Sequence, residues 1–369
     1  MRFICYRNDL NEALQVVMKA VAVKPMTPVL SGIYIRAEST YLELHANNYS
    51  TGIIVKIPAK GEILGETVVS GKRLQDFVRN MPNDMITFSD ENDENILMIR
   101  SGDAKVELLT MLAEEFPKVK QPTLENSFRV RTTVLQDLIQ RTVFAVSKDD
   151  SRPVFTGCCF EIKGDKLSLV ATNTHRLAYA VRQLVEPYPD ASFVVPAETL
   201  RSLMIRLANA SADTYITVQY SERYLTFEFE NIFVNARLIE GAFPPYDRVI
   251  PKSSTTHVNV DIKDFRKAVE LIALMSKETE YNTVKFTFTQ NGIAISSTSP
   301  EVGDASTSVD ANVDGDDLEI SFNAEYILDV LKVLMTTRVS IELNDRYSPA
   351  AFTEPDNPSY IYVVTPVRA

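Results

Sequence analysis

The chain has 369 residues, 45% of them hydrophobic and 24% charged, with a formal net charge of −11 at pH 7. This length favours two or three globular domains over a single core, and no apolar run reaches the roughly eighteen residues of a membrane-spanning helix. The acidic balance argues against a surface that is basic throughout, but it is compatible with a basic channel inside an acidic exterior, because charges are screened beyond about 8 Å at physiological ionic strength.

Helical and strand signals recur in one order three times along the chain. Each period opens with an amphipathic helix, continues with two β-like runs separated by a hairpin-sized gap, and then has a second amphipathic helix. In chain order, the expected first helices are Leu10–Val21, Leu135–Val146 and Phe265–Met275. The paired runs are GIYIRA with YLELHA, GCCFEI with KLSLVA and VKFTFT with GIAISS, and the second helices span 70–82, 196–208 and 323–335.

The second helices share one apolar stripe at positions i, i+3, i+4 and i+7, which is the pattern of a helix with one buried face. The stripes begin at Leu74, Leu200 and Ile327, so they are 126 and 127 residues apart. Their members are Leu74, Phe77, Val78, Met81; Leu200, Leu203, Met204, Leu207; and Ile327, Val330, Leu331, Leu334. A register kept over such distances indicates an internal repeat.

The repeat predicts an α+β protein of three similar domains, each with two helices packed on antiparallel sheet. Short polar links near KQPTLEN and PKSSTTH give the expected boundaries, which are 1–122, 127–250 and 255–369. Three like domains placed end to end form an arc, and two arcs can close head to tail into a ring.

The cysteines and the first residues bear on the cellular compartment. Cys5 and the adjacent pair Cys158 and Cys159 have neither metal-site nor disulfide-framework spacing, so we expect buried free thiols in a reducing cytoplasm. The opening MRFICYRNDL reaches Arg7 and Asp9 before any apolar stretch long enough for a secretory signal. We expect no metal ion and no other cofactor.

Several blocks in one order carry a resemblance to a known family. They are KPMTPVL (24–30), ATNTHRLA (171–178), LIEGAFPPYDRVIP (238–251) and YVVTPVR (362–368). Together with the triple repeat, they resemble the bacterial sliding clamps, the β subunits of the DNA polymerase III holoenzyme that act as its processivity factor. The resemblance implies a cytoplasmic bacterial homodimer, a closed ring around double-stranded DNA that needs no particular sequence. It also implies short linear peptides of the replicative polymerase, the clamp loader and repair proteins as partners, and no catalytic residue.

His175 is one of three histidines and admits three interpretations from the residues alone: a structural histidine, a ligand-lining residue or a catalytic base. Catalysis needs a positioned nucleophile and an orienting acid, and no G-x-S-x-G motif is present. The resemblance favours a peptide groove, with apolar walls for the anchors of a peptide and polar donors for its backbone. The groove positions that it implies are Phe155, Thr172, Thr174, His175, Arg176, Leu177, Pro244, Arg248, Val249, Tyr347, Pro349, Val363, Thr365, Pro366, Val367 and Arg368.

One departure concerns the wall of this groove. The family commonly has Asp-Gly before the His-Arg pair, where this chain has Asn173-Thr174. We expect the bulkier Thr174 to narrow one wall of the groove.

The resemblance and the helix patterns together suggest which residues face DNA and which join two copies. The expected DNA-facing residues, which could equally lie on an ordinary solvated helix face, are Lys24, Lys72, Arg73, Arg79, Lys148, Arg152, Arg201 and Arg206. Contacts of this kind reach phosphates and carry no sequence information. The expected dimer interface joins Val106 and Leu108 of one copy to Leu274 and Met275 of the other, although four apolar residues could equally belong to the core.

Two further motifs nearly match known sites. GETVVSGKR (65–73) resembles a phosphate-binding loop, but five residues separate its glycines and Arg73 replaces the magnesium-binding Ser or Thr. DANVDG (310–315) resembles half of a calcium loop, but Ser321 stands where the closing Glu would be, so an acidic hairpin turn is expected. DENDEN (90–95) is expected to be a solvated turn without glycine.

The repeat and the resemblance together predict a DNA polymerase processivity clamp. The alternatives are a peptide-binding scaffold that does not encircle DNA, and a hydrolase that uses His175.

Overall fold

The computed structural model describes residues 1–90, 95–121, 125–207, 211, 214–277, 282–300, 303–355 and 357–367, without the side chains of residues 205 and 206. The chain divides into two compact units, each described by itself below. Unit 1 comprises Met1–Thr133 and Glu198–Leu238, and unit 2 comprises Val134–Ala197 and Ile239–Ala369.

Unit 1 is built on one continuous antiparallel sheet. Among the described residues its strand order is β1-β6-β7-β8-β5-β2-β3-β4-β14-β13-β12-β9. The strands are β1 Arg2–Tyr6, β2 Gly32–Ala37, β3 Tyr41–Asn47, β4 Thr51–Ile63, β5 Gly65–Ser70, β6 Met85–Ser89, β7 Ile96–Ser101, β8 Ala104–Met111, β9 Asn126–Arg131, β12 Tyr215–Tyr220, β13 Tyr224–Phe229 and β14 Ile232–Arg237.

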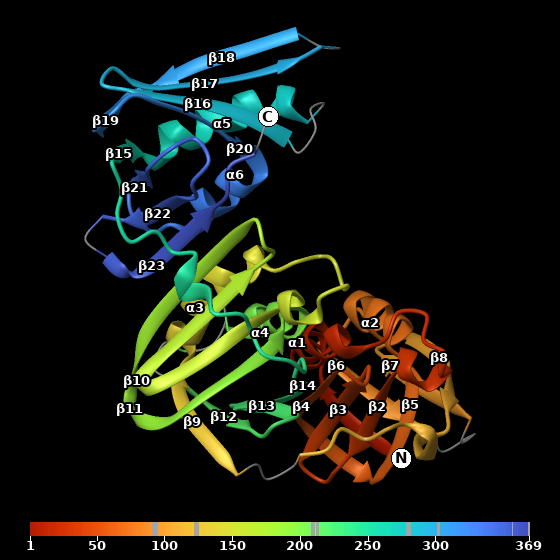
Figure 1. Ribbon diagram of the computed structural model, residues 1–369. Coiled ribbons are helices and arrows are strands. Elements are labelled where there is room, and N and C mark those ends of the chain that lie inside the picture. Colours follow the sequence, from red (N-terminus) through yellow and green to blue (C-terminus); the bar gives the residue numbers. More distant parts are fainter. Residues whose placement is uncertain are drawn as a thin grey trace. The chain divides into compact units, whose positions relative to one another are not determined.

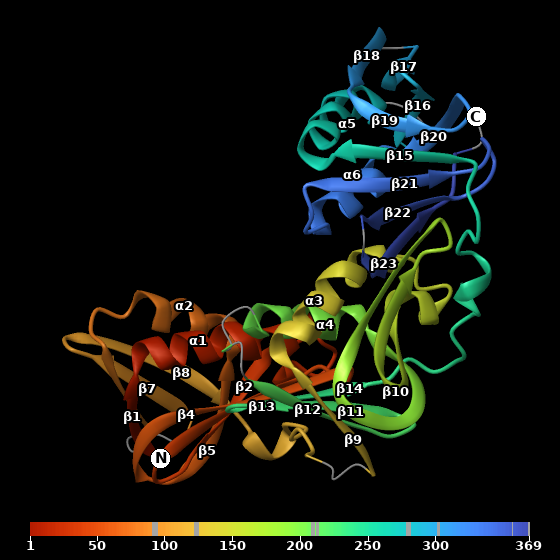
Figure 2. The same ribbon diagram turned by 90° about the vertical axis from the view of Figure 1, so that its left-hand side faces the viewer.

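The helices of unit 1 lie on one side of its strands (Figure 2). They are α1 Arg7–Val17, α2 Gly71–Asn80 and, from Glu198 on, α4 Ala197–Leu207. Stripe residues such as Leu74, Val78 and Leu200 are completely buried, because the apolar face of each helix covers the sheet. Stacked rings, for example Phe3 on Phe88 with centroids 4.5 Å apart, fill the interior of the unit.

Unit 2 contains two antiparallel sheets in its described part. Their strand orders are β10-β11-β23-β22-β21-β15-β19 and β18-β17-β16-β20. The strands are β10 Gly157–Thr172, β11 Arg176–Pro196, β15 Thr256–Asp261, β16 Thr283–Thr289, β17 Gly292–Ser299, β18 Gly303–Val309, β19 Ala311–Asp314, β20 Leu318–Asn323, β21 Arg338–Leu343, β22 Ala350–Glu354 and β23 Asn357–Val364.

The helices of unit 2 are α3 Thr132–Thr142, which enters this unit at Val134, α5 Ile262–Ser276 and α6 Ala324–Val333. Side chains cap the last two: Asp261 accepts hydrogen bonds from two backbone N–H groups of α5, and Asn323 does the same for α6. The short 3-10 turns of both units are Met18–Ala20, Pro28–Ser31, Ala113–Glu115, Val143–Ala145, Pro153–Thr156 and Tyr246–Arg248.

The expected helices are all present, with differences at their ends. The helices α1, α3 and α5 each begin three residues before the predicted start, and α1 and α3 end four residues before the predicted end, where 3-10 turns follow. Their first turns, such as Arg7–Asp9, are largely polar, so the apolar pattern gives no signal there. Within the stripes, Phe77 lies on the exposed side of α2, whereas Leu74, Val78 and Met81 are buried as expected.

Two strand expectations need correction. The runs GCCFEI and KLSLVA belong to a single strand, β10, whose register with β11 shifts on both sides of Gly164, a residue with φ of 57°. Most of DANVDG is strand β19 paired with β15 rather than a hairpin turn, because its apolar residues alternate with polar ones. Residues 91–94 of DENDEN lie outside the described residues. The three cysteines are free and buried, as predicted.

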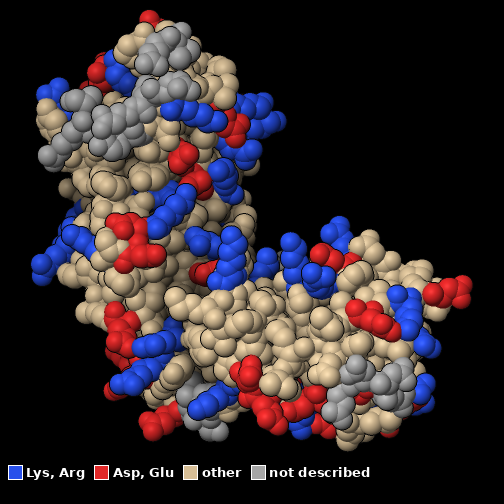
Figure 3. All heavy atoms as spheres, turned by 90° about the vertical axis from the view of Figure 1, so that its right-hand side faces the viewer, with Lys and Arg blue, Asp and Glu red and all other residues tan. Residues whose placement is uncertain are grey.

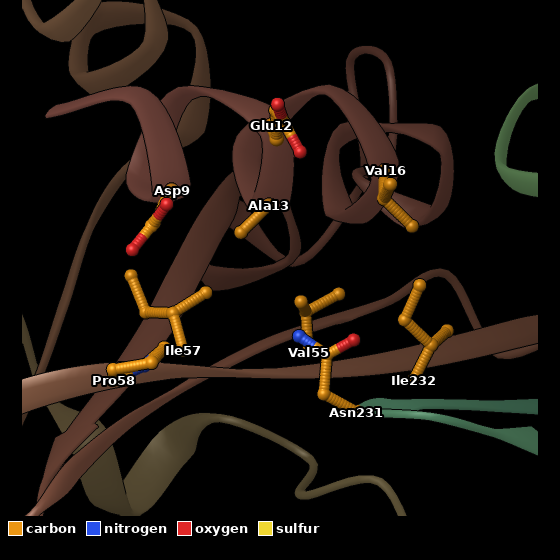
Figure 4. Close-up of a pocket in the computed structure, with 9 residues that line it drawn as sticks. All are labelled: Asp9, Glu12, Ala13, Val16, Val55, Ile57, Pro58, Asn231 and Ile232. Atoms are coloured by element: carbon orange, nitrogen blue, oxygen red, sulfur yellow. The ribbon is translucent and has the colours of Figure 1, made fainter. Parts of the chain in front are cut away.

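Unit 1 also holds a cavity of about 240 Å³ between α1 and the strands β4 and β14 (Figure 4). Asp9 and Glu12 project from the helix, and the apolar side chains of Val16, Ile57 and Ile232 form much of the remaining wall. The cavity marks a place where helix and sheet are incompletely packed.

Candidate functional site

The loop between β10 and β11 is held in shape by its own short polar side chains. Thr172 Oγ1 donates to the carbonyl oxygen of Arg176 at 2.7 Å and accepts from the Thr174 N–H at 3.1 Å. The Asn173 side-chain oxygen accepts from the N–H groups of His175 and Arg176 at 3.1 and 3.0 Å. These bonds satisfy the loop backbone internally, so Thr174 and His175 extend from a fixed frame.

Strand pairing brings distant groove residues to this loop. Leu177 in β11 lies opposite Val363 in β23, and the Thr365 N–H and hydroxyl both donate to the His175 carbonyl oxygen, at 2.9 and 3.0 Å. Leu177 and Val363 are buried in a cluster with Cys159, Val170 and Val194. The predicted residues 172, 174–177, 363 and 365 therefore form one continuous part of unit 2, on a rigid apolar base.

Arg176 has a different place from the one expected of a peptide donor. Its side chain is only 8% exposed, and its guanidinium donates to Asp329 Oδ2 at 2.8 Å and to the Phe144 carbonyl oxygen at 2.6 Å. The same group lies 4.4 Å from the ring centre of Tyr326. Burial opposes the charge, but Tyr362 and the Asp329 carboxylate outweigh it and keep the pKa of Arg176 above its usual value. Arg176 thus positions the loop from behind.

His175 is exposed, and its imidazole has no hydrogen-bond partner in the part of the chain that the structure describes. A catalytic histidine needs an orienting acid and a nucleophile within hydrogen-bond reach. Asp329, the acid that pairs with Arg176 of the loop, also pairs with Lys332. The arrangement suits a donor at the surface of a binding site.

The remaining predicted groove residues lie in three segments of unit 2. Pro244, Arg248 and Val249 are exposed around the 3-10 turn Tyr246–Arg248, whose Tyr246 ring packs against the buried cluster. Phe155 is half-buried, with its ring centre 6.2 Å from that of Phe243. The exposed Tyr347 and the half-buried Pro349 precede β22, while the half-buried Pro366 and Val367 follow β23. Arg368 lies outside the described residues.

Three residues that hold the loop in place were not among the predicted site residues. They are Asn173, within the loop, and Tyr326 and Asp329, which contact it. Asn173 Nδ2 donates to the Tyr326 hydroxyl at 3.2 Å, and Asp329 pairs with Arg176, so both contacts join residues 153 positions apart. Asn173 could have been found from its place in an Asn-x-x-Arg turn. The sequence has no signal that pairs α6 with the loop.

The predicted DNA-facing residues lie at the surface where their side chains are described. Lys24, Lys72, Arg73, Arg79 and Arg201 are exposed in unit 1, and Lys148 and Arg152 are exposed in unit 2. The side chain of Arg206 lies outside the described part. In Figure 3, Lys and Arg side chains gather along the upper edge of unit 1, the edge on which Figure 2 shows its helices. This face would attract phosphates without reading bases.

The predicted dimer residues lie at strand and helix edges. Strand β8 pairs with β5 only through Thr110 and Met111, so the edge of its first residues, where Val106 and Leu108 lie, is open within unit 1. Leu108 is buried and Val106 is half-buried. On α5, Leu274 is 64% exposed and Met275 is half-buried. An open sheet edge and an exposed leucine are each typical of an interface between chains.

Neither a metal cluster nor a membrane helix is found among the described residues. No group of three or more His, Cys, Asp or Glu side chains there could hold a metal ion. No helix is long and apolar enough to cross a membrane.

Comparisons with known proteins agree with this picture over the whole length of the chain. Models of the N-terminal, central and C-terminal domains of the DNA polymerase III beta subunit match residues 1–120, 129–245 and 247–368. Beta sliding clamps of Vibrio cholerae and Bacillus subtilis are each 29% identical, over 100% of this chain and 100% of the relative.

Solved structures give the same result. The DNA polymerase III beta subunit of Thermotoga maritima has a TM-score of 0.93 at 28% identity, covering 100% of this chain and 99% of that one. The sliding clamp of Pseudomonas aeruginosa bound to griselimycin also has a TM-score of 0.93 at 28% identity, with 100% of both chains covered.

The repeated domains of two helices on antiparallel sheet define the class of DNA clamps, as predicted. The chain belongs to the beta sliding clamp family, the beta subunits of DNA polymerase III. The family and the processivity function predicted from the sequence are both confirmed.

Proposed function

We propose that two copies of the chain close head to tail into a ring around double-stranded DNA, and that the loop 172–176 with its neighbours docks partner peptides. The chain contributes binding and topology, and no chemistry. Its partners are the replicative polymerase and the clamp loader, in the bacterial cytoplasm, and the three folding repeats are 1–122, 127–250 and 255–369.

The docking part of this proposal rests chiefly on one observation. An internally bonded loop presents the exposed His175, and the same unit carries the exposed apolar residues Val249 and Tyr347. Apolar anchors and a few backbone-directed donors are what an extended peptide requires. A rigid site avoids the entropic cost of ordering the loop on binding.

The encircling part rests on the exposed basic residues and on the family of the chain. Phosphate contacts weaken steeply with salt, so they allow sliding and do not by themselves keep a protein on DNA. A closed ring leaves only by opening or at an end of the DNA. The ring thereby holds a docked polymerase on the DNA and raises its local concentration there.

Retention on DNA of defined topology tests the ring. The protein is assembled with its loader and ATP on a nicked circular plasmid, and gel filtration separates bound from free protein at high salt. We expect retention on the circle and release when a restriction enzyme linearises it. Equal retention on both forms would contradict encirclement and favour direct binding, and retention on neither would favour the scaffold.

Substitution of His175 tests the docking surface. The His175→Ala protein should bind the replicative polymerase of the same bacterium more weakly, while the ring still assembles on circular DNA. Unchanged polymerase affinity would place docking elsewhere. A hydrolytic turnover that His175→Ala abolishes would instead support the enzyme alternative.

A further inference from the structure

Unit 1 contains a second cavity, of about 360 Å³, that the function proposed above does not use. Its lining residues, all of them described, come from the β3–β4 loop, the segment after Phe116, and the strands β13 and β14. They are Asn47, Tyr49, Ser50, Gly52, Pro117, Lys118, Val119, Lys120, Tyr224, Asn235 and Arg237. They include three basic side chains and no acidic one.

The loop of this cavity repeats the geometry of the loop 172–176. Tyr49 and Thr174 both have positive φ, 68° and 77°. Asn48 Oδ1 accepts from the N–H groups of Ser50 and Thr51 at 3.1 and 2.8 Å, as Asn173 Oδ1 does two and three residues ahead. The Tyr49 N–H donates to Asn47, just as the Thr174 N–H donates to Thr172. The two loops are therefore equivalent, 125 residues apart.

The strands beside the two loops are equivalent as well. Thr51 in β4 lies opposite Ala236 in β14, as Arg176 in β11 lies opposite Val364 in β23. The Arg237 N–H then donates to the Ser50 carbonyl oxygen at 2.9 Å, and the Thr365 N–H donates to the His175 carbonyl oxygen at the same distance. Arg237 thus stands where the candidate peptide groove has Thr365.

Further correspondences follow from this register. The Phe116-Pro117 pair corresponds to Phe243-Pro244, and each phenylalanine packs in an apolar cluster of its own unit. Tyr224 precedes β13 residue Leu225, which is opposite Ala236, so it corresponds to Pro349, which precedes Ala350 opposite Val364. The cavity of unit 1 is consequently built like the candidate peptide groove of unit 2.

The two sites differ in charge. Lys118, Lys120 and Arg237 correspond to Pro245, Asp247 and Thr365 of unit 2. Lys118 is partly neutralised, since its ammonium lies 3.0 Å from Glu66. Lys120 is exposed and pairs with no acid among the described residues. At these three positions, only the site in unit 1 has side chains that favour negative charge in an occupant.

Aromatic surface accompanies the positive charge. Tyr49 is 63% exposed and Tyr224 is 44% exposed, although large aromatic side chains usually gain by burial. Val119 and the side-chain-free Gly52 form an apolar floor: a Cβ at Gly52 would come within 2.8 Å of Val119. A single apolar side chain of an occupant could rest on this floor between the two tyrosines.

We infer that this cavity is a second docking site, which takes an extended acidic peptide segment of a partner protein with one apolar or aromatic anchor. The inference rests on the proposed function, because the equivalent groove in unit 2 is taken to bind peptides. Carboxylates of the segment meet Lys120 and Arg237, and the anchor fills the space above Val119. One chain then holds two partners of different charge at once.

Fluorescence anisotropy with two synthetic peptides tests the inference. The probe is a fluorescein-labelled peptide, Glu-Asp-Glu-Leu-Phe-Asp-Glu, and its partner has Gln and Asn in place of the acids. Full-length protein should bind the acidic probe at least fivefold more tightly than the neutral one, with affinity falling between 50 and 300 mM salt. Equal affinity for the two peptides would overturn the inference.

Variants then locate the binding. Lys120→Glu and Tyr224→Ala should each lower the affinity for the acidic probe at least fivefold. Lys60→Glu, an exposed change of the same charge on β4 away from the lining, should not. His175→Ala should also leave the affinity for the probe unchanged while it lowers the affinity for the polymerase. If His175→Ala alone lowers probe affinity, the probe occupies the groove of unit 2 and the second site does not exist.

Two controls complete the test. Thermal unfolding must show that Lys120→Glu and Tyr224→Ala are folded, and their polymerase affinity should equal that of the unchanged protein. If the affinity for the polymerase does not depend on His175 while the affinity for the probe still depends on Lys120, the proposed docking function is wrong and the second site is supported. A single-stranded oligonucleotide that displaces the probe at lower concentration than unlabelled peptide would reassign the cavity to nucleic acid.

Discussion

At the scale of single residues, the loop 172–176 is strained at one position. Thr174 has φ of 77°, a conformation that β-branched residues rarely adopt, because Cβ meets the backbone. Its side chain is exposed and makes no compensating hydrogen bond within the described residues, while its N–H is held by Thr172. A glycine at this position would carry no such strain.

Thr174→Gly should therefore stabilise the protein. Relief of the backbone strain stabilises the folded state by on the order of 1–3 kcal/mol. The extra conformational freedom of glycine in the unfolded chain opposes this by about 0.4–1 kcal/mol. We expect a gain near 1 kcal/mol in the free energy of unfolding, measured by urea denaturation. A peptide titration on the same variant checks whether Thr174 narrows the groove, and affinity that does not increase would argue against that.

His45 gives a prediction for pH. It is buried in unit 1 beside Glu43, with its Nε2 3.3 Å from the Glu43 carboxylate and its ring edge-on to Tyr34. Burial lowers the pKa of His45 from 6.5, and the nearby Arg36 and Lys118 add to the effect against the opposing Glu43. As the pH falls through 6.5, His45 therefore takes up a proton in the unfolded chain before it does so in the folded protein.

It follows that His45 favours the folded state above pH 6.5 and penalises it progressively below. Between pH 7.5 and 5.5 the unchanged protein should lose more unfolding free energy than His45→Gln, whose amide can still donate to Glu43. Denaturant titrations at the two pH values measure the difference. Equal losses would show that His45 titrates alike in both states.

At the scale of elements, the equivalent helices α1 of unit 1 and α3 of unit 2 are packed differently. In unit 2, Arg141 of α3 is buried and bonded to Asp137 at 2.7 Å and to Glu354 at 3.0 Å. Arg182 reaches the same Asp137 at 2.6 Å. In unit 1, the corresponding residues of α1 and β4 are Val16 and Ile57, and the space is partly empty, as Figure 4 shows.

Filling this cavity should stabilise unit 1. Ala13 lines the cavity, and its counterpart in α3 is the fully buried Leu138. Ala13→Leu should raise the free energy of unfolding by about 0.5–1 kcal/mol, as cavity-filling changes commonly do. Differential scanning calorimetry checks it, with Gln15→Leu on the exposed face of α1 as a control for helix propensity alone. A lower unfolding temperature for Ala13→Leu would mean that the helix cannot move to admit the side chain.

Elements also show what could be predicted from the sequence. The stripes at Leu74, Leu200 and Ile327 placed the second helices correctly, because burial of one helix face leaves a periodic trace. The burial of Arg176 could not be foreseen, since it depends on Asp329 and Tyr326, far away in the chain. Side-chain partners brought together by strand pairing leave no periodic signal.

At the scale of the whole molecule, repeats and compact units do not coincide. The predicted repeats follow the sequence period, whereas the units follow sheet pairing: β14 of the central repeat joins β4, and β11 joins β23. Antiparallel edges therefore continue from one repeat to the next within each unit. Within the described sheets, the first residues of β8 have no strand partner on the β5 side, and β9, β10, β18, β19 and β20 are terminal strands with a partner on one side only.

Open edges and exposed leucines predict the assembly between copies. Leu274 on α5 is 64% exposed, so it contributes little to the folding of unit 2, and in a dimer it would be desolvated. Leu274→Asp would place an unpaired charge in that interface, which costs several kcal/mol. We expect the variant to sediment as a monomer at concentrations where the unchanged protein is a dimer, and to be lost from circular DNA.

A matched substitution separates this effect from a general one. Val185 in β11 has the same exposed fraction, 64%, and Val185→Asp introduces the same charge in the same unit. This control should remain dimeric and keep its hold on the circle. Both variants should unfold at nearly the temperature of the unchanged protein, because neither side chain belongs to the core. If Leu274→Asp still sediments as a dimer, the contact lies elsewhere and the open edges must be protected by another means.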